Sequence, residues 1–208
     1  MVYKLKDAIY GLAVGDALGV PFEFKERKSF ECTDMIGYGT HGQPEGTWSD
    51  DTSMTLATCM GIKNKGCVDL TDIRNQFEKW LFNNEYTPFN EVFDCGNTCY
   101  CAIKDKCGQT DEWSNGNGSL MRIIPLAFIK EITDETIEDV SAITHAHNIS
   151  KNICIKYVHI AKKLLNGMDL QDTIKKETSN EFFDDLLKCN EENIMSGSFV
   201  VDSFKASL

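Results

Sequence analysis

The chain has 208 residues, 42% of them hydrophobic and 25% charged, with a formal net charge of −11. These values are typical of a folded protein with a sizeable core, so we expect a single domain over residues 1–208. The negative charge argues against a nucleic-acid partner, because phosphate binding needs a concentrated face of lysine and arginine. No apolar run is long enough to span a bilayer, so we expect no membrane partner.

The nine cysteines do not indicate a disulfide framework, because their number is odd and no signal-peptide apolar region precedes them. We therefore expect reduced thiols and a cytoplasmic location. Four of them lie close together in the sequence and raise the question of a zinc site: Cys95, Cys99, Cys101 and Cys107. No C-x-x-C pair and no histidine at zinc-finger spacing accompany them, which favours ordinary small core residues.

The N-terminal segment, from about residue 3 to residue 18, predicts an amphipathic helix that Pro21 ends. Three glycines fall four residues apart on it: Gly11, Gly15 and Gly19. Such a stripe costs helix stability, so it indicates close approach of another helix or of a ligand. Asp16 lies within the helix, and we favour a structural acceptor of backbone N–H groups over a part of the site. Glu23 follows between apolar residues.

The segment from Gly46 to Thr55 places hydroxyl and carboxylate groups where a loop runs into a helix. Ser49, Asp50 and Asp51 supply the oxygen ligands that Mg²⁺ prefers. The alternative is a helix cap, with Ser49 or Asp50 as the N-cap residue and Asp51 favoured by the helix dipole. By itself the motif is more often a cap than a metal site.

Further helices follow along the chain. Thr71 predicts an N-cap before a helix whose apolar positions are Ile73, Phe77, Trp80 and Leu81. The turn from Asp94 to Thr98 precedes another helix. Two more helices are expected over about 137–146 and 149–165, the second stopped by Asn166-Gly167. Residues 196–208 predict a last helix with an apolar stripe, Val201, Phe204 and Leu208, on which the sequence ends.

The loop from Asn115 to Ser119 predicts an anion site, with a helix starting directly after it at Leu120. Its glycines and asparagines permit positive φ angles, so that successive backbone N–H groups point into one concavity. The alternative is a simple turn. Arg122 either reaches a phosphate or pairs with a neighbouring acid. His147 and His159 are taken as structural histidines.

Three blocks of the sequence together resemble the ADP-ribosylglycohydrolase family: residues 15–23, 46–52 and 115–122. The resemblance implies an all-α fold of compact, orthogonally packed helices. It also implies a binuclear Mg²⁺ or Mn²⁺ centre and hydrolysis of the bond between the ribose anomeric carbon and a modified protein side chain. The implied partner is ADP-ribose or an ADP-ribosylated protein.

The resemblance also assigns roles to individual residues. Ser49, Asp50 and Asp51 match the metal positions of the family, and Glu23 matches a glutamate near the metals, so the catalytic candidates are Glu23, Asp50 and Asp51. The ligand-binding candidates are the loop Asn115, Gly116, Asn117, Gly118 and Ser119, together with His145. Glu23 would orient the attacking water or act as an acid or base.

The sequence departs from the family in one respect. Members carry a further C-terminal Gly-Asp-x-Asp-Thr motif that supplies metal carboxylates, and no such motif occurs here. We therefore expect either a hydrolase with an incomplete centre or one completed by a second chain. The alternatives are an inactive module that binds ADP-ribose or a partner, and a truncated gene product. The acceptor side chain, whether arginine, serine or another, is not encoded in the motifs.

Overall fold

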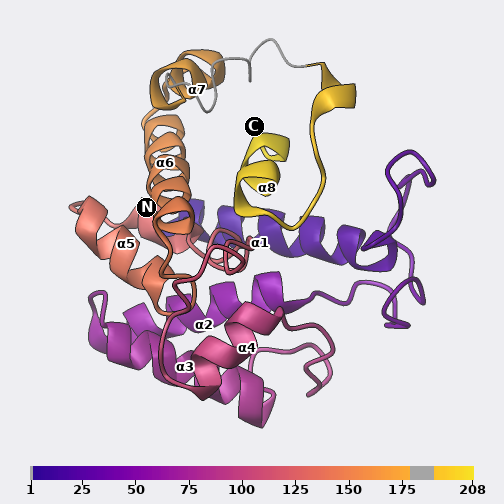
Figure 1. Cartoon of the computed structure of the whole chain (residues 1–208), viewed down its shortest axis with the longest axis horizontal. Helices are drawn as coiled ribbons and strands as arrows, with labels where there is room; N and C mark the ends of the chain where they lie inside the picture. Colours follow the sequence, from indigo (N-terminus) through magenta and orange to yellow (C-terminus); the bar gives the residue numbers. More distant parts are fainter. Residues whose placement is uncertain (1, 179–189) are drawn as a thin grey trace. The chain divides into compact units, whose positions relative to one another are not determined.

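The computed structural model describes residues 2–178 and 190–208. Throughout these ranges the chain forms helices joined by loops and contains no β-strand, which confirms the predicted all-α class (Figure 1). The chain divides into two compact units, residues 1–106 and 107–208, which we describe separately. None of the helices in the described ranges has the length and apolar character needed to cross a membrane.

Unit 1 contains four α-helices and a short 3-10 helix. They are α1 (Val2–Gly19), η1 (Val20–Phe22), α2 (Asp50–Lys65), α3 (Leu70–Asn83) and α4 (Asn97–Lys104). Helix α2 packs against both α1 and α3, and α3 packs against α4 (Figure 1). The core between α2 and α3 is formed by Met54, Ala57, Ile73, Phe77 and Trp80, each at most 1% exposed. Burying these large apolar side chains is the main stabilising term of the unit.

Two expectations for unit 1 need correction. The N-cap of α3 is Asp69, whose side chain accepts from the Asp72 N–H at 2.7 Å, so Thr71 is not the cap. The carboxylate of Asp69 competes successfully because aspartate is among the strongest N-cap residues. The glycine stripe of α1 is not packed against a helix, since a Cβ at Gly11, Gly15 or Gly19 would meet no atom of the described chain within 4 Å.

Unit 2 is built around α6 (Asn148–Leu165), which packs against η2 (Ile124–Phe128), α5 (Asp134–Ala142), α7 (Leu170–Glu177) and α8 (Val200–Ala206). A further 3-10 turn, η4, spans Glu191–Asn193. Gly167 takes a positive φ of 85° directly after Asn166, the C-cap residue of α6, as the Asn-Gly signal predicts. His159 contacts Asp134 and Glu177, which confirms its structural role.

Three predicted helices of unit 2 differ from those observed. The helix expected over about 137–146 is α5, which begins at Asp134 and ends at Ala142. The segment after the Asn115–Ser119 loop continues as turns and enters the 3-10 helix η2 only at Ile124. Pro125 explains the difference, because proline lacks an N–H and disfavours helical geometry in the residue before it. The last helix, α8, ends at Ala206, so Leu208 lies outside it, while Val201 and Phe204 are buried as expected.

Candidate active site

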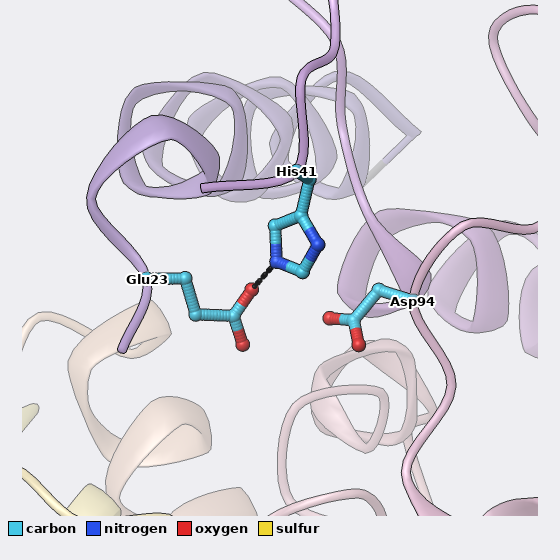
Figure 2. Close-up of side chains that lie close together, drawn as sticks. All are labelled: Glu23, His41 and Asp94. Atoms are coloured by element: carbon cyan, nitrogen blue, oxygen red, sulfur yellow. Dashed lines mark hydrogen bonds and ion pairs between the residues drawn. The ribbon is translucent and has the colours of Figure 1, made fainter. Parts of the chain in front are cut away.

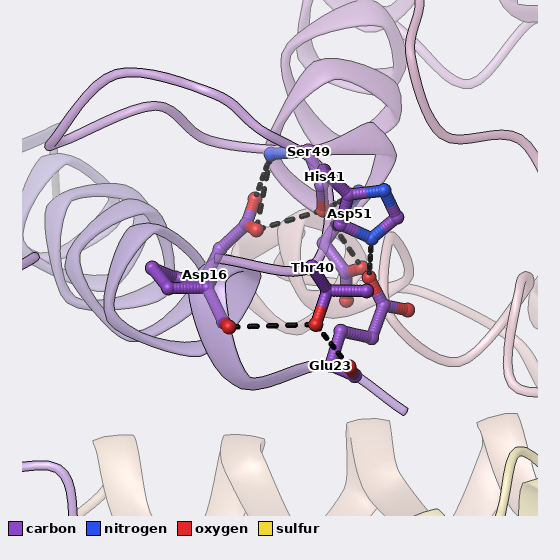
Figure 3. A network of polar contacts seen from close by, with 7 residues as sticks. Asp16, Glu23, Thr40, His41, Ser49 and Asp51 are labelled. Atoms are coloured by element: carbon purple, nitrogen blue, oxygen red, sulfur yellow. Dashed lines mark hydrogen bonds and ion pairs between the residues drawn. The ribbon is translucent and has the colours of Figure 1, made fainter. Parts of the chain in front are cut away.

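The start of α2 is held by a carboxylate from α1. Asp16 accepts hydrogen bonds from the N–H and Oγ of Ser49, at 3.0 and 2.7 Å, and from the N–H and Oγ1 of Thr52, at 3.0 and 2.6 Å. Ser49 is the N-cap residue, and its Oγ accepts from the Asp51 N–H at 3.4 Å (Figure 3). The helix-cap interpretation is therefore confirmed, and so is the structural role of Asp16 as an acceptor of N–H groups.

A second cluster joins three segments of unit 1. The side chains of Glu23, His41 and Asp94 point toward one another, and one ligand atom from each lies within 4.8 Å of the others (Figure 2). Glu23 Oε2 and His41 Nε2 are 2.5 Å apart. Carboxylate and imidazole atoms gathered this closely form a group that could hold a metal ion.

The loop before α2 places His41 in this cluster. Gly39 packs so tightly on Pro21 that a Cβ would lie 2.1 Å from the Pro21 carbonyl oxygen, which excludes any other residue without a backbone shift. The next residue, Thr40, donates through its Oγ1 to the Glu23 carbonyl at 2.6 Å and through its N–H to the Pro21 carbonyl at 3.1 Å. These contacts tie the loop to the segment that carries Glu23.

Burial and mutual repulsion raise the pKa values of the acids. Burial raises the pKa of Asp51 to about 7, and the charges of Asp16 and Glu23 add to the shift. Burial also raises the pKa of Asp50, which is 8% exposed, with Asp51 as the largest charged contributor. The pKa of Glu23 rises through burial and the charge of Asp94. A divalent cation would stabilise the ionised forms of such a group, so the donor set fits one.

A cavity of about 470 Å³ opens beside these acids within unit 1. The side chains of Asp16, Glu23, Ser49 and Asp51 line it, together with the exposed glycines of α1 and several apolar residues: Gly15, Gly19, Leu18, Val20, Phe22, Phe30 and Cys32. Asp50 is not among the lining residues. Gly15 and Gly19 of the glycine stripe thus border open space, which agrees with the ligand alternative for its role.

The predicted metal residues Ser49, Asp50 and Asp51 all lie at the first turn of α2. The structure adds His41 and Asp94, which sequence reasoning did not assign to the site. Two features of the sequence could have indicated these residues: a histidine ten residues before Asp51 and an acid at the start of the turn 94–98. Burial raises the pKa of the Cys95 thiol, next to Asp94, to about 12.

The four clustered cysteines do not all lie in the core, as the sequence had favoured. Cys99 is buried, but Cys95 and Cys101 are half-buried and Cys107 is exposed. The eight cysteines in the described part of the chain are free, and none of them joins a metal-binding group there. The ninth, Cys189, lies outside the described residues.

In unit 2 the Asn115–Ser119 loop is anchored by its own side chains. The amide of Asn115, which is 3% exposed, bonds to His147 Nδ1 at 3.0 Å and accepts from Ser150 Oγ at 2.9 Å. The Asn117 N–H donates to the Ser198 carbonyl at 3.0 Å. No residue of this loop has a positive φ. The expectation of a concavity built on positive φ angles is therefore wrong, because bonds to neighbouring segments shape the loop instead.

This network continues into the interior of unit 2 through four residues: Ser119, Arg122, Thr144 and His145. Arg122 is 0% exposed, and its Nη2 donates to Thr144 Oγ1 at 2.8 Å and to the Val140 carbonyl at 3.2 Å. The guanidinium is thus directed into the interior of unit 2, away from any ligand outside it. Ser119 is also 0% exposed, and its Oγ accepts from Ser141 Oγ at 3.0 Å.

His145 stands between this network and the loop. Its Nδ1 lies 2.9 Å from Thr144 Oγ1, and a Cβ added to Gly116 would lie 3.7 Å from its Nε2. Burial lowers the pKa of His145 to about 3, and the positive charge of Arg122 contributes. The imidazole is therefore neutral near pH 7. We assign the hydroxyl proton of Thr144 to Nδ1, which leaves the imidazole proton on Nε2, toward Gly116.

The family model described as ADP-ribosylglycohydrolase matches residues 3–206 of the chain. The chain belongs to the ADP-ribosylglycohydrolase family. It is 28% identical over 226 residues to the ADP-ribosylarginine hydrolase Tri1 of Pseudomonas putida, a match that covers 99% of this chain and 60% of that protein. It is also 31% identical over 179 residues to the ADP-ribosyl-[dinitrogen reductase] glycohydrolase of Rhodospirillum rubrum, covering 79% of this chain and 58% of the relative.

A solved structure shares the fold. The chain matches a structure titled "ADP-ribosylglycohydrolase-related protein complex" with a TM-score of 0.76 and 22% identity, covering 96% of this chain and 72% of the other. At this identity the match shows the ADP-ribosylglycohydrolase fold alone. The chain spans about 60% of the length of the curated relatives that it matches along nearly its whole length.

Proposed function

We propose that this chain is a hydrolase that releases ADP-ribose from modified protein side chains. The observation that carries the proposal is the group of Glu23, His41 and Asp94 beside a cavity that Asp51 also lines. Family membership supports it, and two of the relatives are named as hydrolases of ADP-ribosylated arginine and of ADP-ribosylated dinitrogen reductase. The carboxylates supply the acid and base groups that cleavage of a glycosidic bond needs.

We propose Mg²⁺ or Mn²⁺ as the cofactor. The residues that would hold it are Ser49, Asp50 and Asp51 at the start of α2 and the carboxylates of Glu23 and Asp94, because these oxygen donors suit either ion. A bound ion would bind ribose hydroxyls and stabilise the charge that develops on the substrate. His41 would hold the Glu23 carboxylate in place through their 2.5 Å contact.

Glu23 is the proposed acid–base residue. Its carboxylate accepts a proton from the attacking water, whose oxygen bonds to the ribose anomeric carbon while the bond to the acceptor side chain breaks. The departing nitrogen or oxygen takes up a proton, so the products are free ADP-ribose and the unmodified side chain. Unlike Asp16, whose oxygens are engaged by Ser49 and Thr52, Glu23 keeps a carboxylate that is about one-third exposed.

For unit 2 we propose contacts to ADP-ribose. The loop from Asn115 to Ser119 is held by Asn115, His147 and Ser150, so its backbone is positioned before a ligand arrives. His145 contributes a neutral imidazole whose Nε2 proton is directed toward the loop at Gly116. A neutral donor suits this position because it forms a hydrogen bond without adding a buried charge.

The test is release of ADP-ribose from an ADP-ribosyl-arginine peptide by the purified chain. We expect release with Mn²⁺ or Mg²⁺ and loss of release when EDTA removes the ion. A parallel calorimetric titration with ADP-ribose separates the possible outcomes. Binding without turnover under either metal would identify a binding module, and neither binding nor turnover would reject the proposed function.

A further inference from the structure

The proposed acid–base residue lies in a tight turn that contains an unusual phenylalanine. The Lys25 N–H donates to the Phe22 carbonyl at 3.1 Å, which closes a four-residue turn over residues 22–25. Glu23 is its second residue, with φ −53° and ψ 144°, and Phe24 is its third, with φ 59°. These angles are those of a type II turn, whose third position favours glycine because φ is positive there. A phenylalanine at this position strains the backbone.

Burial of the Phe24 side chain does not offset this strain. Phe24 is 79% exposed, so its ring gains little from the removal of apolar surface from water. The ring contacts the imidazole of His41 edge to face, with centroids 5.8 Å apart and planes inclined by 62°. Backbone strain without a matching gain in packing is typical of functional positions. The contact with His41 is therefore the basis for a functional role of Phe24.

A second phenylalanine approaches the same imidazole. The Phe93 ring lies 5.3 Å from that of His41, with planes inclined by 55°. Phe93 directly precedes Asp94 in the sequence, and Phe24 directly follows Glu23. Each acid of the cluster is thus next in the chain to a ring that contacts His41, whose side chain is 13% exposed. Because aromatic pairs prefer particular relative orientations, the two rings restrict the orientation of the imidazole.

We propose that Phe24 is a positioning residue, which holds the His41 imidazole so that its Nε2 meets the Glu23 carboxylate. This inference rests on the proposed function, in which Glu23 is the acid–base group. The two atoms that the placement brings together, His41 Nε2 and Glu23 Oε2, are 2.5 Å apart (Figure 2). A carboxylate fixed in this way accepts the proton of the attacking water without first reorienting.

Replacing Phe24 by glycine separates this role from a purely structural one. Glycine fits a positive φ better than phenylalanine does, so Phe24→Gly should not lower the melting temperature. It should still lower kcat for release of ADP-ribose about tenfold and leave KM unchanged, because the catalytic geometry is lost while the substrate contacts remain. Phe24→Tyr keeps the aromatic edge and should therefore retain the wild-type kcat.

Lys28→Gly is the matched control. Lys28 is the third residue of the next turn, which the Ser29 N–H closes on the Glu26 carbonyl at 3.0 Å, and its φ is 66°. This substitution relaxes the same backbone conformation and leaves the Phe24 ring in place, so kcat should not change. Two results would overturn the positioning role of Phe24: a lower melting temperature in Phe24→Gly, or a raised KM at unchanged kcat, which would make Phe24 a substrate contact.

A measurement without turnover separates failure of this inference from failure of the proposed function. Nuclear Overhauser contacts between the His41 ring protons and the Glu23 side chain, assigned with the help of His41→Gln, report on the pair directly. They should weaken in Phe24→Gly and persist in Phe24→Tyr and Lys28→Gly. Persistence in Phe24→Gly would overturn the inference, even for a chain that hydrolyses its substrate. Weakening in a chain that hydrolyses no ADP-ribosylated peptide would keep the placement of His41 by Phe24 and reject the proposed function.

Discussion

The polar cluster of unit 1 is largely half-buried and acidic, whereas the polar cluster of unit 2 is fully buried and mostly neutral. At the start of α2 several carboxylates lie together, and burial with mutual repulsion raises their pKa values. In unit 2 the buried groups around His145 are mostly neutral, and the one buried guanidinium, Arg122, donates to a carbonyl and a hydroxyl. The first arrangement is costly without a cation, whereas in the second the Arg122 Nη2 donates to acceptors of the chain itself.

In our proposal this difference separates a site for chemistry in unit 1 from a scaffold for binding in unit 2. Carboxylates held near one another at raised pKa values are typical of acid–base and metal sites, where the repulsion is offset by a ligand. A network of neutral hydrogen bonds gives a rigid loop, which lowers the ordering cost of binding. We therefore expect substitutions in unit 1 to change the reaction rate, and substitutions in unit 2 to change stability and affinity.

The largest effect is expected from Glu23→Gln. Loss of the proposed acid–base group should lower hydrolysis by roughly 10²–10⁴-fold, the usual contribution of general acid–base catalysis. Affinity for ADP-ribose should stay within about threefold, because an amide keeps the size of the side chain. Single-turnover kinetics and calorimetry on the same preparation measure the two quantities. A loss of affinity equal to the loss of rate would show that Glu23 serves binding and that the separation of roles is incorrect.

The next effect concerns stability, through Arg122→Met. Removing the guanidinium leaves a buried carbonyl and the Thr144 hydroxyl without this donor, which should lower the free energy of unfolding by about 2–4 kcal/mol. Because the Arg122 charge lowers the pKa of His145, the same variant should raise that pKa, as followed by NMR. Arg74→Met in α3 is the control at a half-buried arginine of unit 1. Equal losses in urea unfolding would argue against a special role for Arg122.

The pH dependence of unit 2 gives an effect that grows gradually as the pH falls. The pKa of His145 is lowered from 6.5 to about 3, so the unfolded chain takes up a proton that the folded chain does not. The contribution of His145 to stability is fully present above pH 6.5 and is lost as the pH falls toward 3, by up to about 1.4 kcal/mol per pH unit.

His145→Gln isolates this contribution from the titration of the acids in unit 1. The difference in unfolding free energy between the wild-type chain and this variant should shrink as the pH falls from 6.5. Urea unfolding at a series of pH values measures the difference. A constant difference across that range would mean that His145 is protonated in the folded chain.

The smallest change is expected from Gly116→Ala, which sharpens the assignment of the loop. A Cβ at this position would lie 3.7 Å from His145 Nε2 and 3.8 Å from the Ser198 carbonyl oxygen, which are ordinary contacts. Stability should therefore change by no more than about 0.5 kcal/mol. The added methyl group would separate His145 from a ligand on the loop, so ADP-ribose affinity should fall about tenfold in calorimetry. Unchanged affinity would remove His145 and Gly116 from the ligand site.

Local sequence patterns determined the helices and the nature of the first turn of α2. The periodic apolar positions predict α1, α3 and α6, because each helix buries one face and the pattern is contained within that helix. The cap at Ser49 and the acids that follow it are equally local. The exceptions are also local in cause, since Asp69 is a stronger N-cap than Thr71, and Pro125 prevents a regular helix after the Asn115–Ser119 loop.

The tertiary structure alone decided which side chains meet. The cluster of Glu23, His41 and Asp94 joins three segments of the chain. Its assembly depends on the tight packing of Gly39 against Pro21, which no periodic pattern in the sequence encodes. The burial of Arg122 likewise depends on acceptors from Val140 and Thr144. Helix formation depends on residues three or four apart, whereas contacts and pKa values depend on groups brought together through space, and only folding determines those distances.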